Sequence, residues 1–262
     1  MLLIGVPFRG GWEGGGLILR EHFERSGNWL FKHRGYLPLL LLAILLPALA
    51  RFWHPGGRPK DDLSWEFLCL GISLVGLGIR AAVIGYVPAG TAGRNTSGQI
   101  AKTLNTSGLY SVVRHPLYLG NWIMWLGVMM FPGVWWCPVI GGLVFWLYYE
   151  RIMFAEEEFL RREFGEEWLA WAECTPAIIP ALHGWRPTGR GFSIRHVLRR
   201  EHPGLFALVS SLTALEIMSD AVRDRRFEVD PVWGVLFVCT GTMFMILRTM
   251  KHRTKLLHVD RS

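Results

Sequence analysis

The sequence lacks the residue patterns that form metal sites and disulfide frameworks. Its 262 residues include only four cysteines, at no CxxC spacing, and three of them lie inside apolar runs. It also contains no HExxH motif and no other set of His, Asp and Glu at metal-ligand spacing. Disulfide-rich domains and thiolate metal sites depend on such spacings. We therefore expect neither a disulfide framework nor a metal ion.

Charged residues are scarce as well, and apolar residues take their place. Asp, Glu, Lys and Arg make up 19% of the chain, whereas 51% is hydrophobic and 13 residues are Trp. A typical soluble domain contains about 25% charged residues. The composition excludes an ordinary soluble domain and indicates an integral membrane protein.

The apolar residues are gathered in runs that predict transmembrane helices. We expect an all-α fold, a membrane helical bundle with about six spans and a cytosol-facing cofactor pocket. Residues 1–36 are predicted to form an N-terminal interfacial segment, 37–182 the membrane core, and 183–262 a basic C-terminal segment with two additional spans. The expected spans are residues 37–53, 65–87, 117–131, 134–154, 204–219 and 232–248.

Lys and Arg are distributed unevenly between the two sides of this predicted bundle. If the N-terminus is cytosolic, 21 of the 28 lie on cytosolic segments and 6 on the opposite side, while Arg80 lies within a span. Because cytosolic loops of membrane proteins are enriched in Lys and Arg, both termini are predicted to be cytosolic.

The densest polar motif is Arg114-His115-Pro116, directly before the third span. Pro116 disfavours a helical His115 and suits a first helical turn, so a helix should begin here, with an N-terminus suited to an anionic group. Gly120 permits the close approach of a ligand or a neighbouring backbone. The alternative to a binding site is an interfacial aromatic belt. Four polar or aromatic side chains share one face of this helix: Tyr118, Asn121, Trp122 and Trp125.

A second polar element follows the hairpin of the third and fourth spans. A helix here would pair Glu157 with Arg161 at the i,i+4 spacing. Glu158 and Arg162 would form a second such pair on the solvated face. Glu156 has only apolar neighbours on the helix, so its carboxylate needs a cation or hydrogen-bond donors, unless it reaches water at the end of the span.

One charge lies inside the second span. Arg80 needs a carboxylate, a polar cavity or a route to the interface. The surrounding window, Gly76–Ala81, matches a loose dinucleotide fingerprint, but no strand precedes it and the whole window is one apolar run, so we reject that interpretation. Ala81 and Gly85 are expected to form a small-residue packing surface between helices.

The motif from Arg114 to Asn121 and the element from Glu156 to Pro180 carry a family resemblance. Together they are similar to the isoprenylcysteine carboxyl methyltransferase and phospholipid methyltransferase superfamily, over about residues 65–180. The resemblance implies that both elements enclose S-adenosylmethionine at the cytosolic face and that the acceptor enters from the bilayer. Two tryptophans of the second element stand where the family usually has tyrosine, and the two C-terminal spans lie beyond the common core.

The resemblance also implies roles for individual residues of an S-adenosylmethionine-dependent methyltransferase. Glu156 and Glu157 would bind the cofactor's ammonium or ribose hydroxyl groups, and Arg114 or His115 its carboxylate. An aromatic side chain would line the sulfonium by cation–π attraction. The cofactor-binding residues are predicted to be Tyr110, Arg114, His115, Pro116, Tyr118, Gly120, Asn121, Trp122, Glu156 and Glu157.

The acceptor is predicted only as a class. The family methylates prenylcysteine carboxylates, amines and lipid phosphates, and residues 94–108 resemble bacterial members, including those that methylate a phosphate of lipid A. We therefore expect a bacterial inner-membrane protein whose partners are the bilayer and a membrane lipid or lipidated substrate, with neither nucleic acid nor metal. The catalytic candidates, which would orient an anionic acceptor, are Arg80 and Arg151. Five further arginines would either hold an anionic head group or attract any anionic leaflet: Arg186, Arg190, Arg195, Arg199 and Arg200.

Two other functions fit parts of the sequence. Membrane sterol-type reductases, which bind NADPH, share a similar loop, but they usually have Lys-Tyr-Gly where this chain has Phe164-Gly165. The acidic residues 156–158 also suit a cationic cofactor better than a phosphorylated one. A transporter or scaffold would need to explain why the polar residues cluster at one face rather than at mid-bilayer.

Overall fold

Helices account for all the regular secondary structure in the described part of the chain. The computed structural model describes residues 19–35, 45, 47–48, 63–88, 101–225, 227 and 229–254. The fold is therefore all-helical, as predicted, over these residues. The α-helices are α1 (Leu19–Lys32), α3 (Leu63–Tyr86), α4 (Pro116–Met130), α5 (Trp136–Phe164), α6 (Glu166–Cys174), α7 (Ile194–Asp224) and α8 (Pro231–Arg253), with short 3₁₀ helices η1 (Gly108–Ser111) and η2 (Leu182–Gly184).

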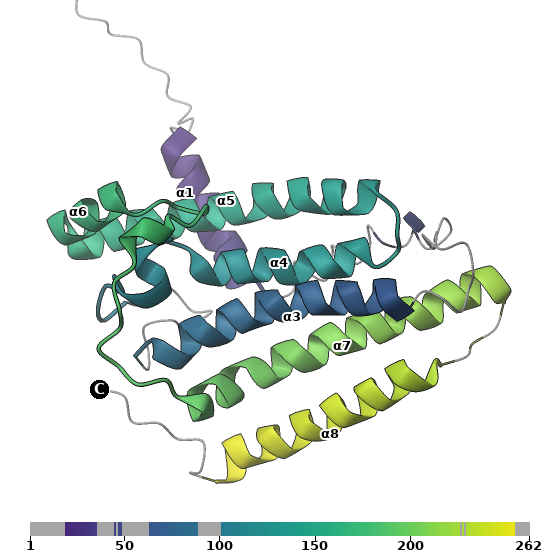
Figure 1. Ribbon diagram of the computed structural model, residues 1–262. Coiled ribbons are helices and arrows are strands. Elements are labelled where there is room, and N and C mark those ends of the chain that lie inside the picture. Colours follow the sequence, from purple (N-terminus) through teal and green to yellow (C-terminus); the bar gives the residue numbers. More distant parts are fainter. Residues whose placement is uncertain are drawn as a thin grey trace, which may run out of the picture.

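The long helices lie side by side as a membrane-type bundle, in the order α5, α4, α3, α7 and α8 across the molecule (Figure 1). Three of them, α3, α7 and α8, are long and apolar enough to cross a membrane. By contrast, the 15 residues of α4 extend about 22 Å, less than the ~30 Å hydrocarbon core. The predicted first span lies outside the described residues except for Leu45, Pro47 and Ala48. The bundle class is confirmed, whereas the number of six spans stays a prediction.

The two polar motifs lie at the ends of α4 and α5. As predicted, α4 begins at Pro116, with His115 as its N-cap. The hairpin between α4 and α5 turns at Gly133, whose φ of 68° favours glycine. From there α5 runs unbroken through the acidic residues to Phe164 and stops before Gly165, which also has a positive φ. A single helix therefore fixes the acidic residues relative to the apolar core.

Small residues allow α3 and α4 to pack closely. A side chain at Gly76 of α3 would collide with the backbone of Gly120 and Met124 on α4. In the same way, a side chain at Gly127 of α4 would collide with Ser73. Helices in membranes associate closely where small residues permit backbone contact. The sequence allowed either a ligand or a neighbouring backbone to approach Gly120. The structure shows that the backbone of α3 at Gly76 approaches it.

The helix-packing surface predicted at Ala81 and Gly85 is wrong at Gly85, whereas its part at Ala81 stays a prediction. The space beside Gly85 is filled by the ring of Phe192, which lies just before α7, rather than by another helix. The same segment is hydrogen-bonded to the end of α3, because Ser193 N donates to Gly85 O at 2.9 Å. The small residue of α3 that packs against α4 is Gly76, not Gly85. Sequence spacing alone does not show which face of α3 meets α4.

The C-terminal helices share the core of the bundle. Leu208, Leu212 and Leu215 of α7 are buried in one hydrophobic cluster with Met129 and Phe131 at the end of α4. The helices that follow the common family core thus pack against it directly. The proposed segment boundaries at residues 36 and 182 stay predictions.

Helix α1 packs across α5, burying Gly27 and Phe31 (Figure 1). Ion pairs join α1 to the acidic half of α5: Arg20 pairs with Glu158, and Glu24 with Arg162 at 2.6 Å. The predicted i,i+4 pairs within α5 are therefore wrong. Glu158 is buried rather than solvated. Because α1 covers this face of α5, charges that looked like neighbours in the sequence find partners on another helix.

Candidate active site

Backbone hydrogen bonds bring the two polar motifs together. Arg114 N donates to Pro176 O at 2.8 Å, and His115 N donates to Ala177 O at 3.2 Å. The chain after α6 therefore lies along the loop that leads into α4. This arrangement satisfies backbone N–H groups of the loop and fixes the position of its charged side chains.

The two tryptophans that depart from the family pattern are both buried at this junction. The indole Nε1 of Trp171 donates to the Tyr110 carbonyl oxygen at 3.0 Å, which ties α6 to η1. Trp168 is also buried. Trp171 thus supplies a hydrogen bond that holds the second motif against the first.

A charged cluster forms where the motifs meet. His115 is 6% exposed and its Nε2 donates to Glu157 Oε1 at 2.9 Å. Arg114 Nε lies 3.2 Å from the same oxygen. Burial acts to raise the pKa of Glu157, but the hydrogen bond with His115 and the charge of Arg114 outweigh it, so this pKa lies below its usual value. Glu157 is therefore an ionised side chain that holds the cluster together.

Glu156 is the more available carboxylate of the pair. Its side chain is 32% exposed, and Oε2 lies 3.8 Å from His115 Nδ1. The Tyr118 hydroxyl is hydrogen-bonded to it. The apolar surroundings predicted for Glu156 are therefore incomplete, because α4 supplies donors that helical spacing on α5 could not reveal. Glu156 nevertheless has fewer ionic contacts than Glu157 and keeps acceptor positions for a ligand.

Arg80 belongs to a polar network next to this cluster. Its Nε and Nη2 each donate to Glu201 of α7 at 2.8 Å, and Nη1 donates to Asn121 Oδ1 at 2.6 Å. Asn121 Nδ2 in turn donates to the Tyr149 hydroxyl at 3.0 Å. The Tyr149 ring lies 4.9 Å from that of Tyr118. The sequence allowed a carboxylate, a polar cavity or a route to the interface for Arg80. In the structure its partner is a carboxylate, that of Glu201.

Sequence reasoning missed Glu201. It lies 121 residues from Arg80, and its side chain is only 5% exposed. A lone Glu just before an apolar run was the one available signal, because a carboxylate at that depth needs a cation.

Arg151, the other catalytic candidate, has its observed contacts on α1. Its Nη1 donates to Ser26 Oγ at 3.2 Å, and its guanidinium lies 4.3 Å from the Phe23 ring centre. Among the cofactor candidates, Trp122 packs against Phe145 with ring centres 5.2 Å apart. The structure therefore does not bring Arg151 into the cluster, and it places Trp122 in the interface between α4 and α5.

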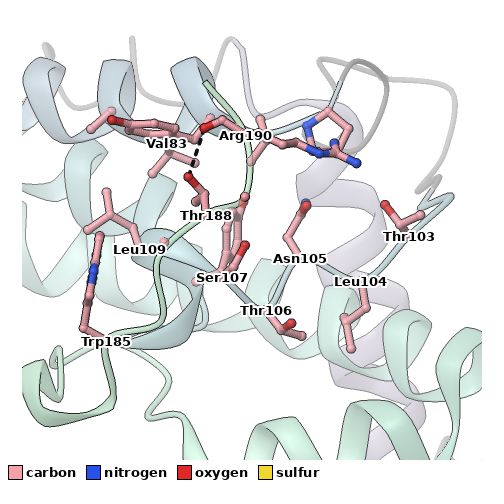
Figure 2. A pocket seen from close by; sticks show the side chains of 17 residues that line it. Val83, Thr103, Leu104, Asn105, Thr106, Ser107, Leu109, Trp185, Thr188 and Arg190 are labelled. Carbon is pink, nitrogen blue, oxygen red and sulfur yellow. Dashed lines mark hydrogen bonds between the residues drawn. The ribbon is translucent and has the colours of Figure 1, made fainter. Parts of the chain in front are cut away.

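A cavity of about 460 Å³ opens beside η1 (Figure 2). It lies between the end of α3, the loop before η1 and the chain that follows η2. Tyr110 is part of its wall, which makes it the one cofactor candidate among the lining residues. The other lining residues are Ala82, Val83, Tyr86, Val87, Pro88, Thr103, Leu104, Asn105, Thr106, Ser107, Gly108, Leu109, Trp185, Thr188, Gly189 and Arg190.

Comparison with known proteins places these motifs in a family. The phospholipid methyltransferase family model matches residues 67–167, which include the motif from Arg114 to Asn121 and the first part of the second element, from Glu156 to Glu167. The protein-S-isoprenylcysteine O-methyltransferase of Schizosaccharomyces pombe is 30% identical over 116 residues, 44% of this chain and 48% of that enzyme. The chain belongs to the isoprenylcysteine carboxyl methyltransferase and phospholipid methyltransferase superfamily.

Two further relatives are similar to parts of this chain. The cobalt-zinc-cadmium resistance protein CzcN of Cupriavidus metallidurans is 30% identical over 159 residues, 61% of this chain and 69% of that protein. The human protein-S-isoprenylcysteine O-methyltransferase is 36% identical over 85 residues, 31% of this chain and 29% of the enzyme. The chain thus spans about half of the yeast enzyme and under a third of the human one. No solved structure is significantly similar to it.

Proposed function

We propose that this membrane protein transfers a methyl group from S-adenosylmethionine to a membrane-embedded lipid or lipidated acceptor. The observation that supports this proposal is the convergence of Arg114, Glu156 and Glu157 around the buried His115. When bound, S-adenosylmethionine supplies an electrophilic methyl group on a sulfonium. The acceptor's lone pair forms the new bond as the methyl–sulfur bond breaks, and that electron pair stays on sulfur.

The charged cluster has the donors and acceptors that this cofactor requires. Glu156 would accept hydrogen bonds from its ammonium or ribose hydroxyl groups. Arg114 Nε forms an ion pair with Glu157 at 3.2 Å, and Nη1 donates to the Ala172 carbonyl oxygen at 3.5 Å. Because a guanidinium has five N–H donors in a planar fork, Arg114 also has donors for the cofactor's carboxylate. Tyr118 would place an aromatic ring near the positive sulfonium.

Methyl transfer requires chiefly alignment and the exclusion of water. The residues of this chain would contribute to both, since backbone hydrogen bonds hold Arg114 and His115 in place and the Tyr118 ring stacks on His115. Arg80 remains our candidate for orienting an anionic acceptor, and its pairing with Glu201 would hold it in position. Arg151 remains a weaker candidate for the same role because its contacts lie on α1.

The charge distribution and the family also support proposals about the membrane topology, the location and the acceptor. We propose six spans, both termini and the cofactor pocket on the cytosolic side, and a bacterial inner-membrane location. A lipid phosphate, such as that of lipid A, is the proposed acceptor. One relative, CzcN, is named a cobalt-zinc-cadmium resistance protein, which raises the question of a metal site in this chain. No group of three His, Cys, Asp or Glu side chains in the described part of this chain is placed to hold a metal ion.

Ligand binding to the purified full-length protein tests the proposal. We expect S-adenosylhomocysteine to bind and NADPH not to bind in equilibrium titrations. Replacement of Glu156 by Gln should weaken S-adenosylhomocysteine binding by about tenfold or more, the effect of losing one charge-assisted hydrogen bond. Glu163, an exposed residue on the same helix, provides the matched control, and Glu163→Gln should change binding less than about twofold. Equal losses in both variants, or binding of NADPH alone, would contradict the proposed function.

A further inference from the structure

We propose that the cavity beside η1 binds the anionic head group of the lipid acceptor, with Arg190 as its charged contact. This inference rests on the proposed methyltransferase function and names the second substrate's site. It separates the acceptor from the donor, which we assign to the cluster around Glu156.

The chemistry of the wall favours an anion. Among the 17 lining residues that the structure describes, there is no Asp or Glu, and Arg190 is the only Lys or Arg. A cationic group such as an ethanolamine ammonium would find no counter-charge there, whereas the guanidinium of Arg190 suits a phosphate or carboxylate. Seven other lining side chains offer hydroxyl or amide groups: Tyr86, Thr103, Asn105, Thr106, Ser107, Tyr110 and Thr188.

The cavity is also amphipathic. Val83 of α3 and Val87, directly after α3, line the side formed by a helix able to cross a membrane. In Figure 2, Leu109 and Trp185 lie at the left end of the cavity, while Asn105 and Thr103 lie toward the right. A ligand with a polar head and an apolar body fits such a wall better than a small, fully hydrated ion.

The cavity is held in place by the same chain segments that build the charged cluster. Gly108 N donates to Arg186 O at 2.8 Å, and Arg186 N donates to Ser111 Oγ at 2.9 Å, so η1 is tied to the chain that carries Arg190. Tyr110 connects the two regions, because it lines the cavity and its carbonyl oxygen accepts a hydrogen bond from Trp171 of the second motif. A head group in the cavity would therefore lie next to the proposed donor site.

The structure also distinguishes among the five basic residues of this region. Arg190 lines the cavity and Arg195, on the first turn of α7, does not, although both residues are exposed. A general attraction to an anionic leaflet would act on both residues about equally, at roughly 1 kcal/mol each. Only a specific site would depend on Arg190 alone.

Binding of dodecyl phosphate to the full-length protein in nonionic detergent tests the inference, at an ionic strength high enough to screen surface charges. We expect Arg190→Gln to raise the Kd for dodecyl phosphate by about tenfold and Arg195→Gln by less than about twofold. Asn105→Asp, which adds a carboxylate to the wall with little change of shape, should also weaken binding. Dodecyltrimethylammonium, with the same chain and opposite charge, should not compete with dodecyl phosphate in the wild-type protein.

A parallel titration with S-adenosylhomocysteine distinguishes this inference from the proposed function. Its Kd should stay within about twofold in all three variants, because the charged cluster is intact. Equal losses of dodecyl phosphate binding at Arg190 and Arg195 would overturn the inference in favour of a surface effect. A parallel loss of S-adenosylhomocysteine binding would assign the cavity to the donor instead. If wild-type protein binds dodecyl phosphate but no S-adenosylhomocysteine, the proposed function fails and the anion site stands.

Discussion

The contact most open to a quantitative test is the one that Glu157 makes with His115 and Arg114. Glu157→Gln keeps the size of the side chain but removes its charge. The lost charge-assisted hydrogen bond is worth roughly 1.5–3 kcal/mol, and this range should apply because His115 is buried and the Glu157 side chain is only 24% exposed. For a protein of this size the loss corresponds to a fall in Tm of about 3–12 °C.

The same contact predicts a pH dependence. The pKa of Glu157 is lower in the folded protein than its usual value, so the carboxylate stabilises the fold fully above about pH 4.5. This stabilisation is lost as the pH falls through the lower, folded-state pKa. The Tm difference between the wild type and Glu157→Gln should therefore be largest near neutral pH and should shrink toward pH 3.

Thermal unfolding of the purified protein in detergent, followed between about pH 7 and pH 3, measures this difference. Glu163→Gln is again the control on the same helix, because Glu163 is exposed. A Tm difference that is constant over this pH range, or no larger than that of the control, would refute the role assigned to Glu157. Binding of S-adenosylhomocysteine separates the two acidic residues, since Glu156→Gln should reduce binding with little effect on Tm.

Two further predictions concern helix packing and orientation. Gly76→Ala should markedly lower the Tm because its Cβ would collide with the backbone of α4. The control Gly78→Ala has open space beside it and should be neutral or stabilising by up to about 1 kcal/mol. Equal effects of the two variants on the Tm would contradict the observed interface between α3 and α4. In a cysteine-free variant, a cysteine at Thr188 should react with an impermeant thiol reagent only from the cytosolic side, and one at Phe227 only from the opposite side. Reversed labelling would invalidate the proposed orientation.

Local features of the structure follow from the sequence alone. The start of α4 at Pro116 follows from the fixed φ of proline and its missing N–H, which depend only on neighbouring residues. The turn at Gly133 and the helical, membrane-type class likewise depend on local sterics and on runs of apolar residues. The two motifs were also recognisable, because residue types in a fixed order suffice to indicate a family.

The choice of partners was decided only by the tertiary structure. The sequence paired Glu158 with Arg162, but α1 lies across α5 and supplies Arg20 instead. It left Arg80 without a defined partner, and the carboxylate that neutralises it is Glu201, on a helix 121 residues away. Ion pairs of this kind depend on which helix faces meet, and helical periodicity specifies a face without specifying its neighbour. For the same reason, five arginines of equal charge in the sequence became distinguishable only when the fold placed one of them on a cavity wall.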